Sequence, residues 1–165
     1  MEIERKFKIN KLPDNLEDYR FHMIEQAYLN IHPVIRIRQQ DEEYYLTYKG
    51  QGLLVREEYN LPLTKEAYEH LKTKADGNII SKKRYLIPLD SSCFLETALL
   101  SEEERNTSLT IELDVFDPPF YPLVLAEVEF PSEAAAYAFL PPSWLGEDVT
   151  ENPAYHNSNM SRQEL

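Results

Sequence analysis

Acidic and basic side chains alternate with other residues along the first eight positions, Met1-Glu2-Ile3-Glu4-Arg5-Lys6-Phe7-Lys8. Because successive side chains of an extended strand point to opposite faces, the two glutamates and the two lysines share one face, and Ile3, Arg5 and Phe7 share the other. Glutamate oxygens are suitable ligands for Mg²⁺ or Mn²⁺, and lysine and arginine suit phosphate oxygens. A face that carries both types could bind a polyphosphate through metal ions.

Six later segments place charge at alternate positions in the same way. The charged residues are Arg36 and Arg38, Lys49, Arg56 and Glu58, Lys82 and Arg84, Glu112 and Asp114, and Glu127 and Glu129. A charged face on any one strand most often faces solvent. Seven such strands, each with a largely apolar opposite face, indicate a sheet that closes into a barrel with a charged interior. A network of salt bridges without a catalytic role is the alternative interpretation of the same residues.

The elements that must position these residues follow from the same periodicity. The alternating pattern predicts strands over 2–8, 22–31, 34–39, 44–49, 55–61, 79–88, 109–116 and 124–130. Thr64 is predicted to cap a helix of about ten residues, and Ser132 is predicted to cap a helix over 133–140. Asp76-Gly77-Asn78 predicts a turn, residues 90–108 a loop with a weak helix, and residues 144–165 mostly loop with at most a short terminal turn.

Composition limits the class of protein. A chain of 165 residues is long enough for one domain with its own core. Its 17 basic and 29 acidic residues give a formal charge of −12, so the outer surface should repel nucleic acids, and phosphate binding requires a local basic cluster or a metal ion. A single cysteine, Cys93, excludes an intrachain disulfide framework, and no apolar run has the length of a membrane span or the layout of a signal peptide. We therefore expect a soluble, cytoplasmic protein with no nucleic-acid or membrane partner.

The opening Glu2-Ile3-Glu4-Arg5-Lys6 resembles the ExExK signature of the CYTH superfamily, the triphosphate tunnel metalloenzymes. Further motifs follow in that family's order, so that the resemblance extends from residue 2 to about residue 160. They are Arg36-Ile37-Arg38, Tyr48-Lys49-Gly50, Arg56-Glu57-Glu58, Lys82-Lys83-Arg84-Tyr85, Ile111-Glu112-Leu113-Asp114-Val115-Phe116, Ala126-Glu127-Val128-Glu129, Trp144-Leu145-Gly146-Glu147-Asp148-Val149-Thr150 and Tyr155-His156-Asn157-Ser158.

The resemblance implies a mainly β (α+β) fold, in which a closed antiparallel eight-stranded tunnel barrel has helices packed outside. It also implies dependence on Mg²⁺ or Mn²⁺, and a single CYTH-like domain over residues 1–165. The implied metal-binding carboxylates are Glu2, Glu4, Glu127 and Glu129, with Asp114 as a further acidic ligand. The implied phosphate-binding residues are Lys6, Arg36, Arg38, Lys49, Arg56, Lys82 and Arg84. The implied catalytic residues are Lys6 and, as alternative bases for the attacking water, Glu58 and Glu112.

Two features depart from the family pattern. Many members have a second glutamate two residues after the one at Glu58, whereas this chain has Asn60. That change removes a negative charge and could weaken a second metal site. The segment 90–108 is longer than the usual hairpin at this point, so we predict an inserted loop there.

The predicted function is hydrolysis of a triphosphate, with inorganic tripolyphosphate as the leading substrate and nucleoside or thiamine triphosphate next. A class IV type adenylyl cyclase is one alternative, although no purine pocket is identifiable. A catalytically silent polyphosphate-binding module is another, although such a module would lose the carboxylates that this chain keeps. A homodimer is possible.

Other reactive residues have simpler interpretations. Cys93 has no histidine near it in the sequence and is interpreted as an incidental thiol. The four histidines show no metal-ligand spacing. Tyr28 could line the tunnel or belong to the core, and Asp148 and Thr150 are interpreted as loop and cap residues.

Overall fold

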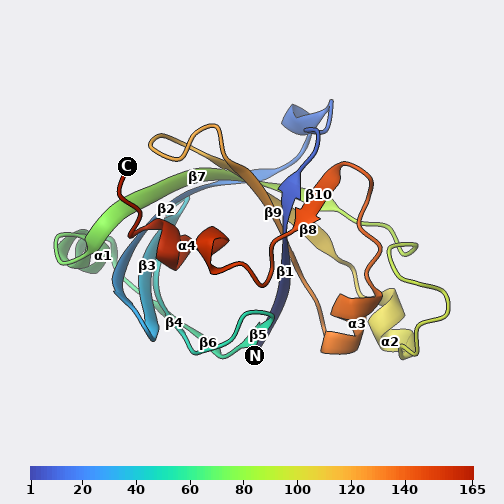
Figure 1. The fold of residues 1–165 in the computed structure, drawn as a ribbon. Coiled ribbons are helices and arrows are strands. Elements are labelled where there is room, and N and C mark those ends of the chain that lie inside the picture. Colours follow the sequence, from blue (N-terminus) through green and yellow to red (C-terminus); the bar gives the residue numbers. More distant parts are fainter.

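The computed structural model describes residues 1–165 and consists mainly of one antiparallel β-sheet (Figure 1). The strands are β1 (Glu2–Ile9), β2 (Phe21–Ile31), β3 (Val34–Gln40), β4 (Glu43–Lys49), β5 (Val55–Arg56), β6 (Glu58–Pro62), β7 (Asp76–Pro88), β8 (Thr110–Phe116), β9 (Val124–Glu129) and β10 (Leu145–Asp148). The α-helices are α1 (Lys65–Lys72), α2 (Glu102–Asn106), α3 (Glu133–Ala138) and α4 (Asn157–Met160), and the 3₁₀ helices are η1 (Leu16–Asp18) and η2 (Pro153–Tyr155).

The sheet curves into a nearly closed barrel. Its strands follow the order β1-β9-β8-β7-β2-β3-β4-β6, and β5 pairs with β1 at the other end of this path. Only Glu57 separates β5 from β6, so the predicted strand 55–61 is present but broken into two pieces that bond to different neighbours. Because β5 and β6 together occupy one position, eight positions complete the ring, and the predicted antiparallel barrel is confirmed.

The apolar faces of the strands point outward and form the core beneath the helices. Phe7, Leu113 and Val128 are buried with the alanines of α3 in one cluster, and Figure 1 places α3 and α2 outside the ring. Most small barrels bury their apolar side chains inside. Here the apolar faces lie outside, and the polar faces line the inside of the barrel. Each fully buried large apolar side chain contributes about 2 kcal/mol to folding, so helix packing outside holds the charged interior together.

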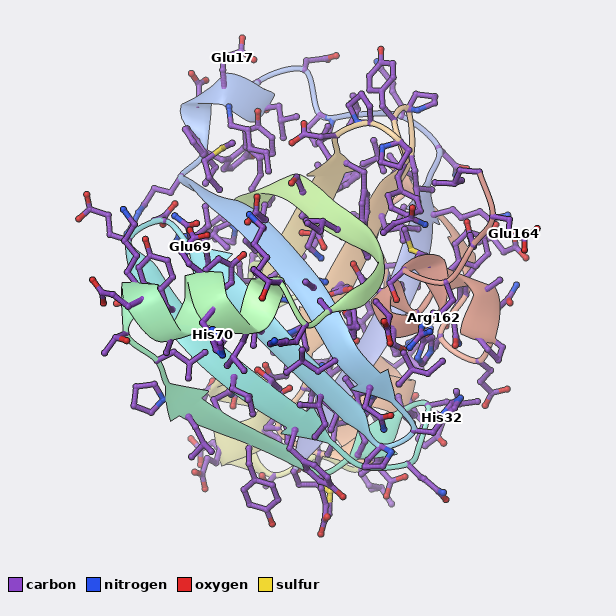
Figure 2. The ribbon with its side chains drawn as sticks, turned by 90° about the vertical axis from the view of Figure 1, so that its left-hand side faces the viewer. Glu17, His32, Glu69, His70, Arg162 and Glu164 are labelled. Atoms are coloured by element: carbon purple, nitrogen blue, oxygen red, sulfur yellow. The ribbon has the colours of Figure 1, made fainter.

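Helix α1 covers another part of the outer face. Thr64 accepts a hydrogen bond from the Ala67 amide and caps the helix as predicted, although the helix has eight residues. Tyr68 is fully buried against Ala27 and Ile37 of the sheet. Figure 2 shows α1 crossing the sheet, with the labelled Glu69 and His70 on this side of the molecule.

The segment between β7 and β8 carries the weak helix that the sequence predicts. Ser101 and Glu104 form a capping box at the start of α2, each side chain bonding to the backbone of the other. Phe94 forms an isolated bridge with Phe139, and Cys93 and Phe94 are buried in the same cluster as α3. The segment therefore closes over the outer core.

Two predictions about the backbone were wrong. Asp76-Gly77-Asn78, predicted as a turn, is the start of β7, where the register with β2 is irregular. The tail, predicted as mostly loop, contains β10, η2 and α4. The two errors are connected, because the Asn78 amide donates to the Ser161 carbonyl at 2.6 Å, and a Cβ on Gly77 would lie 2.2 Å from that same oxygen. Glycine at this position permits the tail to pack against β7.

The tail then enters one end of the barrel. Strand β10 pairs with β1, and the Lys6 amide donates to Thr150 Oγ1 at 3.0 Å. Figure 1 shows α4 within the outline of the strand ring. None of the helices has the length and apolar character required to span a membrane.

Candidate functional site

The barrel encloses a cavity of about 650 Å³. Almost every site residue predicted from the sequence lines it: Glu2, Glu4, Lys6, Arg36, Arg38, Lys49, Arg56, Glu58, Lys82, Arg84, Glu112, Glu127 and Glu129. Asp114 is the exception, because it is fully buried behind the cavity wall. The alternation of charge along the strands thus predicted correctly which side chains face inward.

Four of the cations in the cavity wall are neutralised by carboxylates. Their ion pairs are Lys6–Glu127 at 3.0 Å, Lys49–Glu2 at 2.9 Å, Lys49–Glu58 at 3.2 Å, Lys82–Asp114 at 2.6 Å, and Arg84 with Glu112 at 2.6 Å, Asp114 at 2.7 Å and Glu127 at 2.8 Å. Burial lowers the pKa of Lys82 to about 8, against the opposing effect of Asp114. This part of the wall is a salt-bridge network, as the alternative interpretation expected.

Asp114 is the centre of that network. Its Oδ1 accepts from Arg84 Nε at 2.7 Å, and its Oδ2 accepts from Lys82 Nζ at 2.6 Å and Arg84 Nη2 at 2.8 Å. Although burial opposes it, the charges of Arg84 and Lys82 hold the pKa of Asp114 below its ordinary value. Both oxygens are thus occupied by the two cations, and the side chain orients them towards the cavity.

Three other cations have no carboxylate partner. Arg36, Arg38 and Arg56 line the cavity and form none of the ion pairs in the structure. The Nε atoms of Arg36 and Arg56 are buried without any hydrogen-bond acceptor. Burial, with repulsion from Arg36 and Arg84, lowers the pKa of Arg38. A buried donor without an acceptor is costly, and the oxygens of a bound anion would supply both the missing acceptors and the missing negative charge.

Two facing carboxylates lack a cation partner. Glu4 and Glu129 lie directly opposite each other on β1 and β9, and neither forms an ion pair. Burial and the neighbouring Glu127 raise the pKa of Glu4, and burial and Glu112 raise that of Glu129. Paired carboxylate oxygens that lack a cation suit Mg²⁺ or Mn²⁺. No three carboxylate, imidazole or thiol side chains are grouped closely enough to enclose a metal ion, so the structure identifies suitable donors without a coordination geometry.

The two predicted bases differ in their free oxygens. Glu58 Oε1 accepts from Asn60 Nδ2 at 2.8 Å, and its Oε2 pairs with Lys49 at 3.2 Å. Glu112 uses only Oε2, which accepts from Arg84 Nη1 at 2.6 Å. Asn60 also accepts from Thr47 Oγ1 at 2.6 Å, so the residue that departs from the family pattern is built into the cavity wall.

Sequence analysis missed several polar residues at the site. Gln26 and Thr47 are fully buried inside the barrel, and their inward positions in the strand alternation could have identified them. His156, Asn157 and Ser158 line the cavity from the tail, where no periodicity indicates it. Burial, with repulsion from Lys6, lowers the pKa of His156 to about 4, so the ring is neutral near pH 7.

The sequence did not decide whether Tyr28 lines the tunnel or belongs to the core. In the structure Tyr28 lines the cavity, and only 2% of the residue is exposed.

Comparisons with known proteins agree with this geometry. A family model described as CYTH domain matches residues 1–141. A curated relative from Nitrosomonas europaea named inorganic triphosphatase is 38% identical, covering 97% of this chain and 96% of its own length. Another of that name, from Acetivibrio thermocellus, is 32% identical over 76% of this chain and 70% of its own length. The crystal structure of the inorganic triphosphatase NE1496 superposes with a TM-score of 0.68 at 34% identity, covering 99% of this chain and 96% of that one.

Proposed function

Because the chain belongs to the CYTH domain family, we propose that it hydrolyses inorganic tripolyphosphate to pyrophosphate and phosphate. One observation carries the proposal: a single cavity holds three guanidinium groups without a carboxylate partner, and two facing carboxylates on β1 and β9 without a cation partner. A polyanion and a divalent cation together would supply both missing charges. The names of the two curated relatives support the same activity.

Glu4 and Glu129 are the carboxylates that we propose to hold Mg²⁺ or Mn²⁺, with Glu2 and Glu127 beside them. Glu2 and Glu127 are already paired with lysines, so they fit the cation less directly than the unpaired carboxylates do. When bound, the metal would act as a Lewis acid and stabilise the negative charge that develops during phosphoryl transfer. Asp114 was predicted as a ligand, but its occupied oxygens lead us to propose that it positions Lys82 and Arg84.

The residues of the chain have the following proposed roles. Arg36, Arg38 and Arg56 bind phosphate oxygens directly, because their guanidinium groups have donors to spare. Glu112 orients the attacking water and accepts its proton through Oε1, the oxygen that no protein group occupies. The water oxygen bonds to the terminal phosphorus, the bridging P–O bond breaks, and pyrophosphate leaves. Lys6, Lys49, Lys82 and Arg84 stabilise the charge on the phosphates.

The substrate can be tested directly. Tripolyphosphate has no base or sugar, and all the assigned residues bind phosphate or metal. We predict that purified protein cleaves tripolyphosphate at least as efficiently as ATP, with Mg²⁺ or Mn²⁺, and that ATP gives no cyclic nucleotide. Phosphate release and chromatography of the ATP reaction measure this. Cyclic AMP with inert tripolyphosphate would identify a cyclase instead, and binding of tripolyphosphate without turnover would indicate the silent module.

Arg38→Ala should lower kcat/KM for tripolyphosphate by roughly 30-fold, since a hydrogen bond to a charged group contributes about 2 kcal/mol. Arg38→Lys should recover only part of the loss, because it keeps the charge without the planar fork. Steady-state kinetics of the two variants provide the measurement. Arg20→Ala, an exposed arginine outside the cavity, serves as the control and should leave kcat/KM unchanged. An unaltered kcat/KM in Arg38→Ala would remove Arg38 from the site.

Several further predictions from the sequence stay open in this proposal. They are the single domain over residues 1–165, the insertion at 90–108, the choice between Mg²⁺ and Mn²⁺, the homodimer, the absence of a nucleic-acid partner and the cytoplasmic location.

A further inference from the structure

The Asn157 side chain lies inside the barrel, although it belongs to the tail. Its Oδ1 accepts one hydrogen bond from Gln26 Nε2 and another from Lys82 Nζ, each at 3.2 Å. Asn157 is the first residue of α4 and lines the cavity. It lies beyond residues 1–141, the part of the chain that the family model matches.

The first of these bonds reaches Arg38 through Gln26. The Gln26 amide is fully buried; its Nε2 donates to Tyr28 Oη at 3.0 Å as well as to Asn157, and its Oε1 accepts from Arg38 Nε at 2.9 Å. Because Tyr28 Oη and Asn157 Oδ1 both accept from Nε2, the amide of Gln26 is oriented with its oxygen towards Arg38. Arg38 Nε is thereby occupied. Nη1 donates a long hydrogen bond to Tyr45 Oη at 3.4 Å, and Nη2 has no protein acceptor and is left for a ligand.

The second bond orients Lys82 directly. A lysine ammonium has three donors. One is directed to Asp114 Oδ2 at 2.6 Å and one to Asn157 Oδ1 at 3.2 Å, so a single donor remains for the cavity. Since Asp114 and Asn157 hold the ammonium from two directions, its free proton has a defined orientation.

We propose that Asn157 is a positioning residue that aligns two phosphate-binding cations, Lys82 by direct contact and Arg38 through Gln26. The inference rests on the proposed function, because it assigns those cations to phosphate. It makes the tail part of the binding site, although the strands carry all the charged residues to which the proposed function gives a role. A neutral amide suits this role, since it accepts from both donors without adding negative charge beside a polyanion.

The test measures binding and turnover separately. We would determine the Kd of tripolyphosphate by calorimetry and its kcat and KM by phosphate release, together with Tm, for Asn157→Ala, Asn157→Asp and Asn159→Ala. Asn159 is the matched control, because it lies on the same helix and its Nδ2 donates only to the Pro153 carbonyl, at 2.8 Å. We expect Asn157→Ala to raise Kd and KM about tenfold, as expected for losing a hydrogen bond to a charged group, with kcat changed much less. Asn159→Ala should match the wild type.

Asn157→Asp tests whether the contacts of Asn157 serve the phosphate site or only the packing of the tail. The carboxylate has the same shape and still accepts from Lys82 and Gln26, so a merely structural contact would be preserved and Kd would stay at the wild-type value. If Asn157 lies at the phosphate site, the added negative charge should raise Kd at least as much as Asn157→Ala does, with Tm retained. If Asn157→Ala does not fold, the Kd of Asn157→Asp relative to the wild type still tests the proposal.

The outcomes separate this inference from the proposed function. A wild-type protein that binds tripolyphosphate without cleaving it would refute the hydrolase, and the Kd ratios would still test Asn157. Kd values within twofold of the wild type in both Asn157 variants would overturn the positioning role while leaving the hydrolase intact. No binding by the wild type would overturn both.

Discussion

Glu4→Gln and Glu129→Gln should each lower kcat/KM for tripolyphosphate by roughly 100-fold or more, the scale of losing one catalytic electrostatic contact. These are the carboxylates on the inward faces of β1 and β9 that have no cation partner, so we expect binding of the divalent metal to depend on them most. Glutamine keeps the shape and removes the charge. Phosphate release at a Mg²⁺ or Mn²⁺ concentration that saturates the wild type is the measurement, and a higher metal concentration should restore part of the variants' activity.

The control is Glu103→Gln, on the exposed surface of α2, which should have no effect on kinetics. Tm of the Glu4 and Glu129 variants should stay close to the wild type, because neither side chain makes an ion pair that the substitution would break. Wild-type activity in either variant, or full activity of the native protein in excess EDTA, would contradict the metal assignment.

Asp114→Asn should destabilise the folded protein by about 3–5 kcal/mol, the usual cost of removing one partner from a buried ion pair. Lys82 and Arg84 are 1% and 6% exposed, so the water that could replace the lost carboxylate has little access to them. Denaturant unfolding at pH 7 measures the difference. Leu113→Ile, at the adjacent outward-facing position, is the control for a change in this strand that leaves the charges intact.

The same comparison has a defined pH dependence. Arg84 and Lys82 hold the pKa of Asp114 below its ordinary value in the folded state, against the effect of burial. Its contribution is therefore complete above the unfolded pKa of about 3.9 and is lost as the pH falls through the lower folded pKa. The difference in unfolding free energy between wild type and Asp114→Asn should shrink below about pH 4. A difference that stays constant in acid, or a variant as stable as the wild type at pH 7, would show that this carboxylate does not hold the network together.

The alternation of side chains along the strands predicted the barrel and most of the residues that line it. Glu2, Glu4 and Lys6 face inward because a strand has a period of two residues, and this period can be read within eight residues of chain. The same local rule placed Arg36 and Arg38, and Glu127 and Glu129, on the inner face. The apolar opposite faces required a cover, and the family resemblance implied helices packed outside, as α1 and α3 are.

Which charges neutralise one another was decided by the tertiary structure. The family resemblance implied Asp114 as a metal ligand, yet the register of β7 against β8 places it opposite Arg84. Glu4 and Glu129 are left unpaired for the same kind of reason, since β1 and β9 set two carboxylates side by side. Register joins residues far apart in the sequence, so periodicity within one strand cannot reveal it.

The tail is the clearest case of contacts that local sequence patterns cannot predict. The motif Tyr155-His156-Asn157-Ser158 carries part of the family resemblance but assigns Asn157 no role, and a short helix of four residues has no periodicity that would place its side chain in the site. Its place in the barrel depends on contacts with Gln26 and Lys82, more than seventy positions earlier in each case, and on a glycine at position 77 that lets the tail approach β7. The sequence by itself determined which side chains face the tunnel from the strands, because that property is local. The folded structure alone decided which of them remain free to bind ligand and which segment closes over them, because those properties depend on packing between distant parts of the chain.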